Sequence, residues 1–453
     1  MNHKTMKKRF LITALVVLVG VLIGSVFAVY SNNNVAAIKA AKEQLTVITN
    51  AKIFDGENLI SDTTVVIKDG YIQAVGGEVP ANVTVIDASG ATLMPGLIDA
   101  HVHTDMEGLR DALKFGVTTE LAMHGTWSER ARRRVVNRYD VADVRAPGMG
   151  VEPPGGHPTQ YMASSTNLLL RFFFSFPFVS TPDEAVRHVA KQVFEGADYI
   201  KIFIEDGTVV GFPNLPTPTD ETVRAAVTEA HRHDRMALFH ATTAAATAQA
   251  IEAGADGLVH LFIDVPHTPE LIKAIAGSGA FVVPTLALSR SAVGNDGATP
   301  ASDERVSSRL SGKWLNFLSG SINSFPQGNL DDVFATVMAL HDAGVDILAG
   351  SDVPTEPIPD LGGLAHGVSL HHELQLLVSA GFTPTEALRA ATSIPARRFG
   401  LTDRGRSVPG ARADLLLVDG DPLANISDTL SIRAIWRGGV QLASQELGIK
   451  RPL

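Results

Sequence analysis

Two histidines one residue apart, His101 and His103, end the short apolar segment that begins at Met94. Side chains at positions i and i+2 of a β-strand point to the same face, so the two imidazoles can bind one ion. Imidazole is the side chain that most often binds metal in proteins. A His-x-His pair also occurs for ordinary packing, and a metal site therefore needs further ligands from elsewhere in the chain.

Other strand-like segments also end in residues that can bind metal. His240, His260 and Asp352 each follow a short apolar run, and the isoleucines at 200, 202 and 204 share one face of a strand, which leaves Lys201 pointing inward on the other. Singly, each has an ordinary explanation: a hydrogen-bonded core histidine, an exposed charge or a helix cap. Burying them all inside one domain would be costly unless they interact with one another or with a ligand.

The segments that carry these residues alternate with helical ones, which is the pattern of a parallel α/β sheet. The clearest helices begin after Thr219, over 220–233, and at Thr383, over 383–392. Eight strands predict a TIM barrel, an α/β fold whose active sites lie at the C-terminal strand ends. The predicted strands are 97–103, 117–122, 144–149, 199–205, 236–240, 257–261, 281–286 and 345–352. Two stretches, 148–177 and 289–325, exceed a usual connection and predict lids, substrate walls or disordered segments.

Short β-branched runs separated by turns occur at both ends of the remaining chain, with Asp69-Gly70 as a hairpin signal. We expect residues 45–93 and 405–448 to form one small β domain, and residues 94–404 to form the barrel. At the N-terminus, four basic residues precede an apolar run from Leu11 to Tyr30. Residues 1–31 thus predict a signal peptide or a membrane anchor, with the catalytic domain outside the cytoplasm, secreted, periplasmic or anchored.

Composition narrows the chemistry and the partners. The chain has no cysteine, which excludes disulfides and thiolate ligands. The formal net charge is −10, and removing the +4 of the first ten residues leaves −14 on the rest. This acidic balance argues against nucleic acid as a partner, and against a membrane surface except through the N-terminal segment. A small molecule or a short peptide is the expected substrate, and homo-oligomerisation stays open.

The motif Pro95-Gly96-Leu97-Ile98-Asp99-x-His-x-His, the inward lysine, the two later histidines and the Ser-Asp at 351–352 together resemble the amidohydrolase superfamily. The similarity covers nearly the whole chain and lies in the branch of imidazolonepropionase-like, prolidase-like and ochratoxinase-like enzymes. It extends to the segments 374–388 and 391–396, which are similar to the closing helices of the family. The resemblance implies a TIM barrel with a β-sandwich built from both termini.

The resemblance also implies a centre of two divalent metal ions, commonly zinc. His101, His103 and Asp352 would bind one ion, His240 and His260 the other, and Lys201 would bridge them as a carbamate. A bridging hydroxide would attack the substrate, and Asp352 would act as general base and then acid. The expected reaction is hydrolysis of a C–N amide bond in a dipeptide, an N-acyl amino acid or a cyclic amide.

Alternatives with the same fold stay open. The same centre could hydrolyse a lactone, a carbamate or a phosphotriester, and a scaffold without chemistry is the alternative of another class. Deamination is disfavoured, because residues 241–244 after His240 are Ala-Thr-Thr-Ala and lack the glutamate of superfamily deaminases. Candidate substrate-binding residues are His157, Tyr161, His124 and Arg290.

Overall fold

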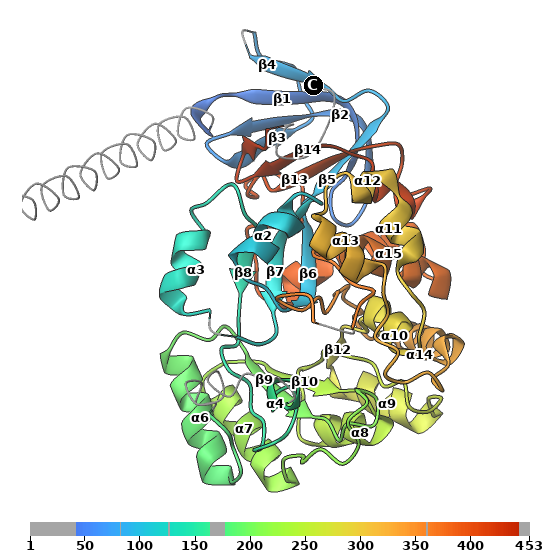
Figure 1. Cartoon of the computed structure of the whole chain (residues 1–453). Helices are drawn as coiled ribbons and strands as arrows, with labels where there is room; N and C mark the ends of the chain where they lie inside the picture. Colours follow the sequence, from blue (N-terminus) through green and yellow to red (C-terminus); the bar gives the residue numbers. More distant parts are fainter. Residues whose placement is uncertain (1–41, 82, 126, 164–176, 359–360, 444–453) are drawn as a thin grey trace, which may run out of the picture.

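The computed structural model describes residues 42–81, 83–125, 127–163, 177–358 and 361–443 (Figure 1). The predicted leader, residues 1–31, lies outside the described residues. Among those that are described, no helix combines the length and apolar character needed to cross a bilayer.

One eight-stranded sheet joins strands from both ends of the chain, which lie side by side at the top of Figure 1. Its order is β15-β14-β13-β5-β1-β2-β3, with β4 paired to β1. The strands are β1 (Thr46–Phe54), β2 (Leu59–Lys68), β3 (Tyr71–Val75), β4 (Thr84–Asp87), β5 (Ala91–Pro95), β13 (Leu415–Asp419), β14 (Ile432–Arg437) and β15 (Val440–Gln441). Asp69 and Gly70 take positive φ angles of 55° and 86° at the predicted hairpin turn between β2 and β3.

The sheet leads directly into the barrel, because β5 is followed after a single glycine by β6 (Leu97–Val102). A Cβ atom on Gly96 would lie 2.3 Å from the side chain of Thr118, so only glycine fits at this junction. The His101-Val102-His103 segment therefore follows from a strand that is fixed at its other end by the sheet.

The barrel wall consists of two parallel sheets and several single bridges. β6, β7 (Val117–Ala122) and β8 (Asp143–Arg145) form one sheet, and β9 (Ile200–Ile204), β10 (Ala237–Ala241), β11 (Gly257–Leu258) and β12 (Phe281–Val282) form the other. A bridge from Val151 to Ile202 joins the segment after β8 to β9, and a bridge from Val282 to Ile347 joins β12 to the eighth segment. The amide of Ala100 donates to the carbonyl of Ala349 over 2.9 Å, which brings the eighth segment against β6.

Four predicted barrel strands differ clearly in extent from the observed ones. The sixth and seventh, expected over 257–261 and 281–286, end at Leu258 and Val282, and Leu286 already belongs to α10. The third was expected over 144–149, but β8 ends at Arg145 and pairing resumes only at Val151. Pro147 has no amide proton to donate, and Gly148 has a φ of 73°. The hydrogen-bond ladder is therefore interrupted between Arg145 and Val151. The eighth was expected over 345–352, and it contributes isolated bonds instead of a regular strand.

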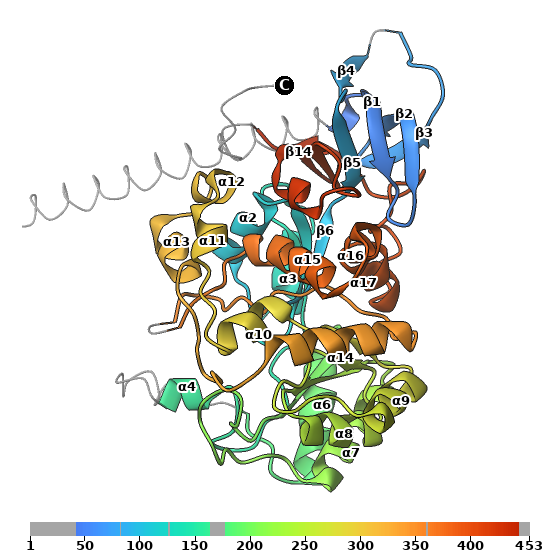
Figure 2. The same ribbon diagram turned by 90° about the vertical axis from the view of Figure 1, so that its right-hand side faces the viewer.

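Helices surround the barrel, as Figures 1 and 2 show from two sides. The predicted helix after Thr219 is α7, and the one at Thr383 is α16, where Thr383 and Glu386 form a capping box. The outer helices are α2 (Met106–Leu113), α3 (Glu129–Val135), α4 (Gln160–Ala163), α6 (Pro182–Phe194), α7 (Asp220–Arg232), α8 (Ala244–Glu252), α9 (Pro269–Ser278), α14 (Leu330–Asp342), α15 (Val368–Ala380), α16 (Pro384–Ala390) and α17 (Ser393–Arg398), with a 3₁₀ turn at Ile426–Leu430.

The prediction that 289–325 is a long loop or disordered segment is wrong. It contains most of α10 (Leu286–Ala292) and all of α11 (Ala298–Ser302), α12 (Glu304–Ser307) and α13 (Gly312–Leu318). Polar residues in this segment supply N-caps, since Asp303 caps α12 and Ser311 caps α13. The buried side chains of Trp314 and Leu318 anchor these short helices to the barrel.

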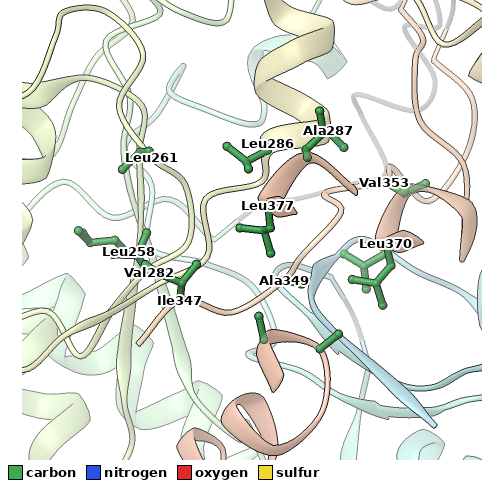
Figure 3. Packing of buried hydrophobic residues seen from close by; sticks show 14 of the residues in the cluster. Leu258, Leu261, Val282, Leu286, Ala287, Ile347, Ala349, Val353, Leu370 and Leu377 are labelled. Atoms are coloured by element: carbon green, nitrogen blue, oxygen red, sulfur yellow. The ribbon is translucent and has the colours of Figure 1, made fainter. Parts of the chain in front are cut away.

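The main core lies between the barrel wall and these helices. Figure 3 shows Leu258, Val282 and Ile347 from three adjacent wall segments, with Leu286 of α10 and Leu377 of α15 nearby, all in one buried cluster. Each such side chain contributes about 1.5–3 kcal/mol when it leaves water. This packing fixes the strands whose C-terminal ends carry the candidate site.

Candidate functional site

His101 and Asp352 bring the ends of the first and eighth wall segments together. Nε2 of His101 lies 3.0 Å from Oδ1 of Asp352, and Nε2 of His103 lies 3.0 Å from the same oxygen. Nδ1 of His101 donates to the carbonyl of Val259 over 2.6 Å, because a carbonyl can only accept. The free lone pair of His101 is therefore on Nε2 and faces the carboxylate, and neither Nε2 of His101 nor Oδ1 of Asp352 has a well-aligned hydrogen bond.

His260 completes a group of three ligand atoms. One ligand atom each from His101, His260 and Asp352 lies within 4.8 Å of the others, and Nε2 of His260 is 3.9 Å from Oδ2 of Asp352. Nδ1 of His260 is 3.0 Å from the hydroxyl of Thr285. Burial lowers the pKa of His101 to about 4 and the pKa of His260 well below its usual value. Both rings are neutral at pH 7 and keep a lone pair for a cation.

Lys201 extends from β9 into the same region. Its side chain is 1% exposed, and its Nζ has no hydrogen-bond partner within the described part of the chain. Burial lowers the pKa of Lys201 to about 7, partly opposed by the charge of Asp352. A large fraction of the amine is therefore neutral at physiological pH, which is the form that reacts with CO₂ to give a carbamate.

His240 of β10 is held by a residue to which the sequence analysis assigned no role. Its Nε2 lies 3.0 Å from Oε2 of Glu205, a fully buried carboxylate directly after β9. The signal for Glu205 was present in the alternation that placed Lys201 inward, because Lys201, Phe203 and Glu205 share one face. His240 itself lies beside His260, with ring centroids 4.3 Å apart.

Phe203 connects the metal-site residues to three of the four candidate substrate-binding residues. Its ring centroid is 5.5 Å from that of His124 and 5.6 Å from that of His157. His157 lies against His240 at 4.4 Å, and Tyr161 lies 5.8 Å from His157. The structure therefore gathers His124, His157 and Tyr161 around the strand ends.

Arg290 is engaged elsewhere. It lies on α10, and its guanidinium donates to the carbonyl of Asp296 over 2.5 Å. Burial lowers the pKa of His372 to about 4, and the charge of Arg290 contributes to this shift. The side chains of Arg290 and His372 are therefore neighbours. None of these contacts links Arg290 to the histidines at the strand ends.

Asp99 holds the two strand ends in register. Its carboxylate accepts the amide of His101 over 3.1 Å, the amide of Ser351 over 3.0 Å and the hydroxyl of Ser351 over 2.5 Å. Gly350 directly precedes Ser351 and Asp352, and a Cβ atom on Gly350 would lie 2.8 Å from Cβ of His101. The sequence motif contains Asp99, but only the structure shows that it links His101 to the residue before Asp352.

The donor set fits a divalent metal ion. Neutral imidazoles and a carboxylate suit zinc and related cations, and unpartnered lone pairs that face each other across 3.0 Å in a buried site are otherwise costly. His101 and His240 each have a hydrogen-bond partner on one ring nitrogen, the carbonyl of Val259 and the carboxylate of Glu205, and such partners commonly orient histidines that bind metal.

Comparisons with known proteins agree with this arrangement. Residues 92–442 match the model of the amidohydrolase family. The chain is 25% identical to adenine deaminase 2 of Latilactobacillus sakei over 395 residues, which cover 85% of this chain and 56%, about half, of that protein. It is 24% identical to ochratoxinase of Aspergillus niger over 435 residues, which cover 85% and 83%. A solved Xaa-Pro dipeptidase has the same fold, with a TM-score of 0.68, 21% identity and coverage of 88% of this chain and 100% of the other. The chain belongs to the amidohydrolase family, whose members are hydrolases, and combines a TIM barrel with a β-sandwich.

Proposed function

We propose that the protein is a metal-dependent hydrolase that cleaves a C–N amide bond in a small peptide, an N-acyl amino acid or a cyclic amide. One observation carries the proposal: buried imidazoles, the carboxylate of Asp352 and the buried amine of Lys201, whose pKa is lowered to about 7, gather inside one end of the barrel. Membership of the amidohydrolase family and similarity to ochratoxinase support the bond type.

In this proposal the residues divide between two ions. His101, His103 and Asp352 would hold one ion, His240 and His260 would hold the other, and a carbamylated Lys201 would be shared by both. One ligand atom of His260 lies within 4.8 Å of ligand atoms of His101 and Asp352, so residues proposed for the two ions are close neighbours. When bound, divalent ions such as zinc activate water and polarise the substrate carbonyl.

Asp352 moves the proton in the proposed reaction. Its carboxylate takes the proton from the attacking water as the new C–O bond forms, and it donates that proton to the leaving nitrogen as the C–N bond breaks. The products are a carboxylic acid and an amine. The backbone amide of Asp352 donates a hydrogen bond of 2.7 Å to the carbonyl of His101, and Asp352 has a left-handed φ of 52°. Both features fix the backbone at this residue.

His157 orients the substrate carbonyl in this proposal, with Tyr161 and His124 lining the pocket. The side-chain amide Nε2 of Gln160 donates to Nδ1 of His157 over 2.7 Å, so the ring is held by its own loop. Because Nδ1 is the acceptor, Nε2 of the neutral ring of His157 carries the proton and can donate to a carbonyl oxygen.

A substrate panel tests the proposed bond type. Metal-loaded protein is assayed against dipeptides, N-acyl amino acids, cyclic amides, lactones, carbamates and phosphotriesters under identical conditions. The proposal expects an amide class to give the highest kcat/KM, by orders of magnitude. Preferred turnover of lactones or phosphotriesters would replace the amide substrate, and absence of turnover with every class would favour a scaffold.

We also propose that the catalytic domain lies outside the cytoplasm. The basic residues before the apolar run from Leu11 to Tyr30 support this location. Fractionation of cells that express the full chain tests it, since activity confined to the cytosolic fraction would contradict export.

A further inference from the structure

Glu205 lies beneath His240 and is fully enclosed. Its Oε2 accepts from the hydroxyl of Thr242 and lies 3.0 Å from Nε2 of His240, and its Oε1 accepts from the amide of Gly207 over 2.7 Å. The side chain of Glu205 has no exposed surface, and that of His240 is 6% exposed. Both carboxylate oxygens are therefore fixed, and one of them is directed at the imidazole.

This contact selects one tautomer of His240. A carboxylate already receiving two other donors acts as an acceptor, so the proton of the neutral imidazole lies on Nε2. A histidine that binds a metal ion does so as the neutral imidazole. The lone pair is then on Nδ1, the nitrogen left for a ligand.

His101 has the opposite arrangement. Its Nδ1–H donates to the carbonyl of Val259, which leaves Nε2 for a cation. His101 and His240 thus leave different ring nitrogens free for a ligand. In each ring, the hydrogen-bond acceptor determines which nitrogen is protonated and which is free. For His101 the acceptor is backbone, whereas for His240 it is a side chain that mutation can remove.

We propose that Glu205 is a positioning residue that fixes the tautomer and ring orientation of His240 and thereby sets the affinity of one of the two metal ions. The inference rests on the proposed function, in which His240 is a ligand. Glu205 also increases the basicity of the imidazole, as carboxylates behind metal-bound histidines do.

The ring of His157 also lies against His240, so the position of His157 depends on the orientation of the His240 ring. The centroid of His157 lies 4.4 Å from that of His240, with an angle of 36° between the rings. Rotation of His240 after loss of Glu205 would displace His157 as well. The Glu205 contact therefore influences both the metal ligand and the candidate substrate contact.

The test compares three variants by metal affinity, measured by competition with a coloured chelator. Glu205→Ala removes the acceptor, whereas Glu205→Gln keeps an oxygen that can accept from Nε2. Glu229→Ala is the matched control, because Glu229 is also nearly buried and lies 3.1 Å from Nε2 of a different histidine, His233, at the C-terminal end of α7. Outer-shell contacts of this kind change affinity by about 10–100-fold.

We expect Glu205→Ala to weaken the binding of one of the two zinc ions by about 10–100-fold and to leave the affinity for the other unchanged. Glu205→Gln should retain most of the affinity, and Glu229→Ala should match the unmodified protein. If Glu205→Ala bound both ions with the same affinities as the unmodified protein, the inference would be overturned. Complete loss of one ion in both Glu205 variants would also overturn it, because Glu205 would then be a ligand.

A second measurement does not depend on metal. In protein labelled with ¹⁵N-histidine, long-range ¹H–¹⁵N spectra report which nitrogen of His240 carries the proton. We expect the Nε2–H form in the unmodified protein and in Glu205→Gln, and a mixture in Glu205→Ala. The Nδ1–H form in the unmodified protein would contradict the inference. Failure of the unmodified protein to bind metal at all would count against the proposed function instead.

Discussion

Nε2 of His101 and Oδ1 of Asp352 lie 3.0 Å apart, at the ends of the first and eighth segments of the barrel wall. Asp99 joins these two ends through the amides of His101 and Ser351. The contact therefore closes the barrel and assembles the candidate site at the same point. Removal of either side chain should therefore affect both the chemistry and the local structure.

Asp352→Asn should reduce kcat by about 10²- to 10⁴-fold, which is the usual contribution of a general acid–base group. The amide is nearly the same size, so the fold should be retained. Steady-state kinetics together with circular dichroism measures both. Loss of less than tenfold would show that another group transfers the proton.

Lys201 should carry a carbamate. Because burial lowers the pKa of Lys201 to about 7, the neutral amine predominates above pH 7 and declines as the pH falls below it. At a fixed pressure of ¹³CO₂, incorporation of label should be greater at pH 8 than at pH 6. The ¹³C signal should be absent in Lys201→Ala and unchanged in Lys191→Ala, whose lysine is exposed on α6. An unaltered signal in Lys201→Ala would exclude this modification.

Gly350→Ala should destabilise the site and the fold together. The added Cβ would lie 2.5 Å from Cγ1 of Val283 and 2.8 Å from the backbone nitrogen of His101. Overpacking of this kind costs about 1–3 kcal/mol. Gly277→Ala on α9 is the control, because nothing lies within 4 Å of its Cβ and alanine favours a helix. Denaturant unfolding and metal content measure the outcome, and two variants with equal values would contradict the predicted crowding.

Asp143→Asn should weaken the junction between the barrel and the sheet. Asp143 is buried on β8 and faces Arg404 at 2.5 Å, Arg412 at 3.3 Å and Arg437 at 4.0 Å. Burial raises the pKa of Asp143, but these guanidinium groups outweigh it and hold the pKa well below its usual value. Removing one partner from such a buried pair costs about 3–5 kcal/mol.

The pH dependence of this loss has a definite sign. A carboxyl with a lowered folded-state pKa stabilises the protein above its unfolded pKa, and that contribution declines as the pH falls below it toward the folded value. The difference in unfolding free energy between Asp143→Asn and the unmodified protein should therefore be constant from pH 7 to 5 and shrink below about pH 4. A difference that grows with acid would contradict the assigned role.

Much of the fold could be predicted from periodicity. The strand and helix alternation gave the barrel, and Thr219 and Thr383 gave the starts of α7 and α16. The third strand was misplaced, because Pro147 and Gly148 end pairing inside an apolar stretch. The four short helices within 286–318 were missed since each is too brief to show a helical period, and their stability comes from buried residues such as Trp314.

The site was partly accessible in the same way. Strand ends identified the histidines and Asp352, and the isoleucine alternation of β9 identified Lys201. Continuing that alternation by two further inward positions would have identified Phe203 and Glu205. The roles of Asp99 and Val259 were not accessible, because each depends on a contact between residues distant in the sequence. Asp99 accepts from the amide of Ser351, and the carbonyl of Val259 accepts from Nδ1 of His101. Arg290 illustrates the opposite case, because its place after the seventh strand gives no information about where its long side chain points.

Metal content tests the central claim most directly. Purified protein is dialysed against zinc, freed of excess metal and analysed by elemental mass spectrometry beside Asp352→Asn and a chelator-treated sample. The account predicts two equivalents per chain, loss of activity on chelation and recovery when zinc is restored. Less than one equivalent, with activity unchanged by chelator, would contradict it.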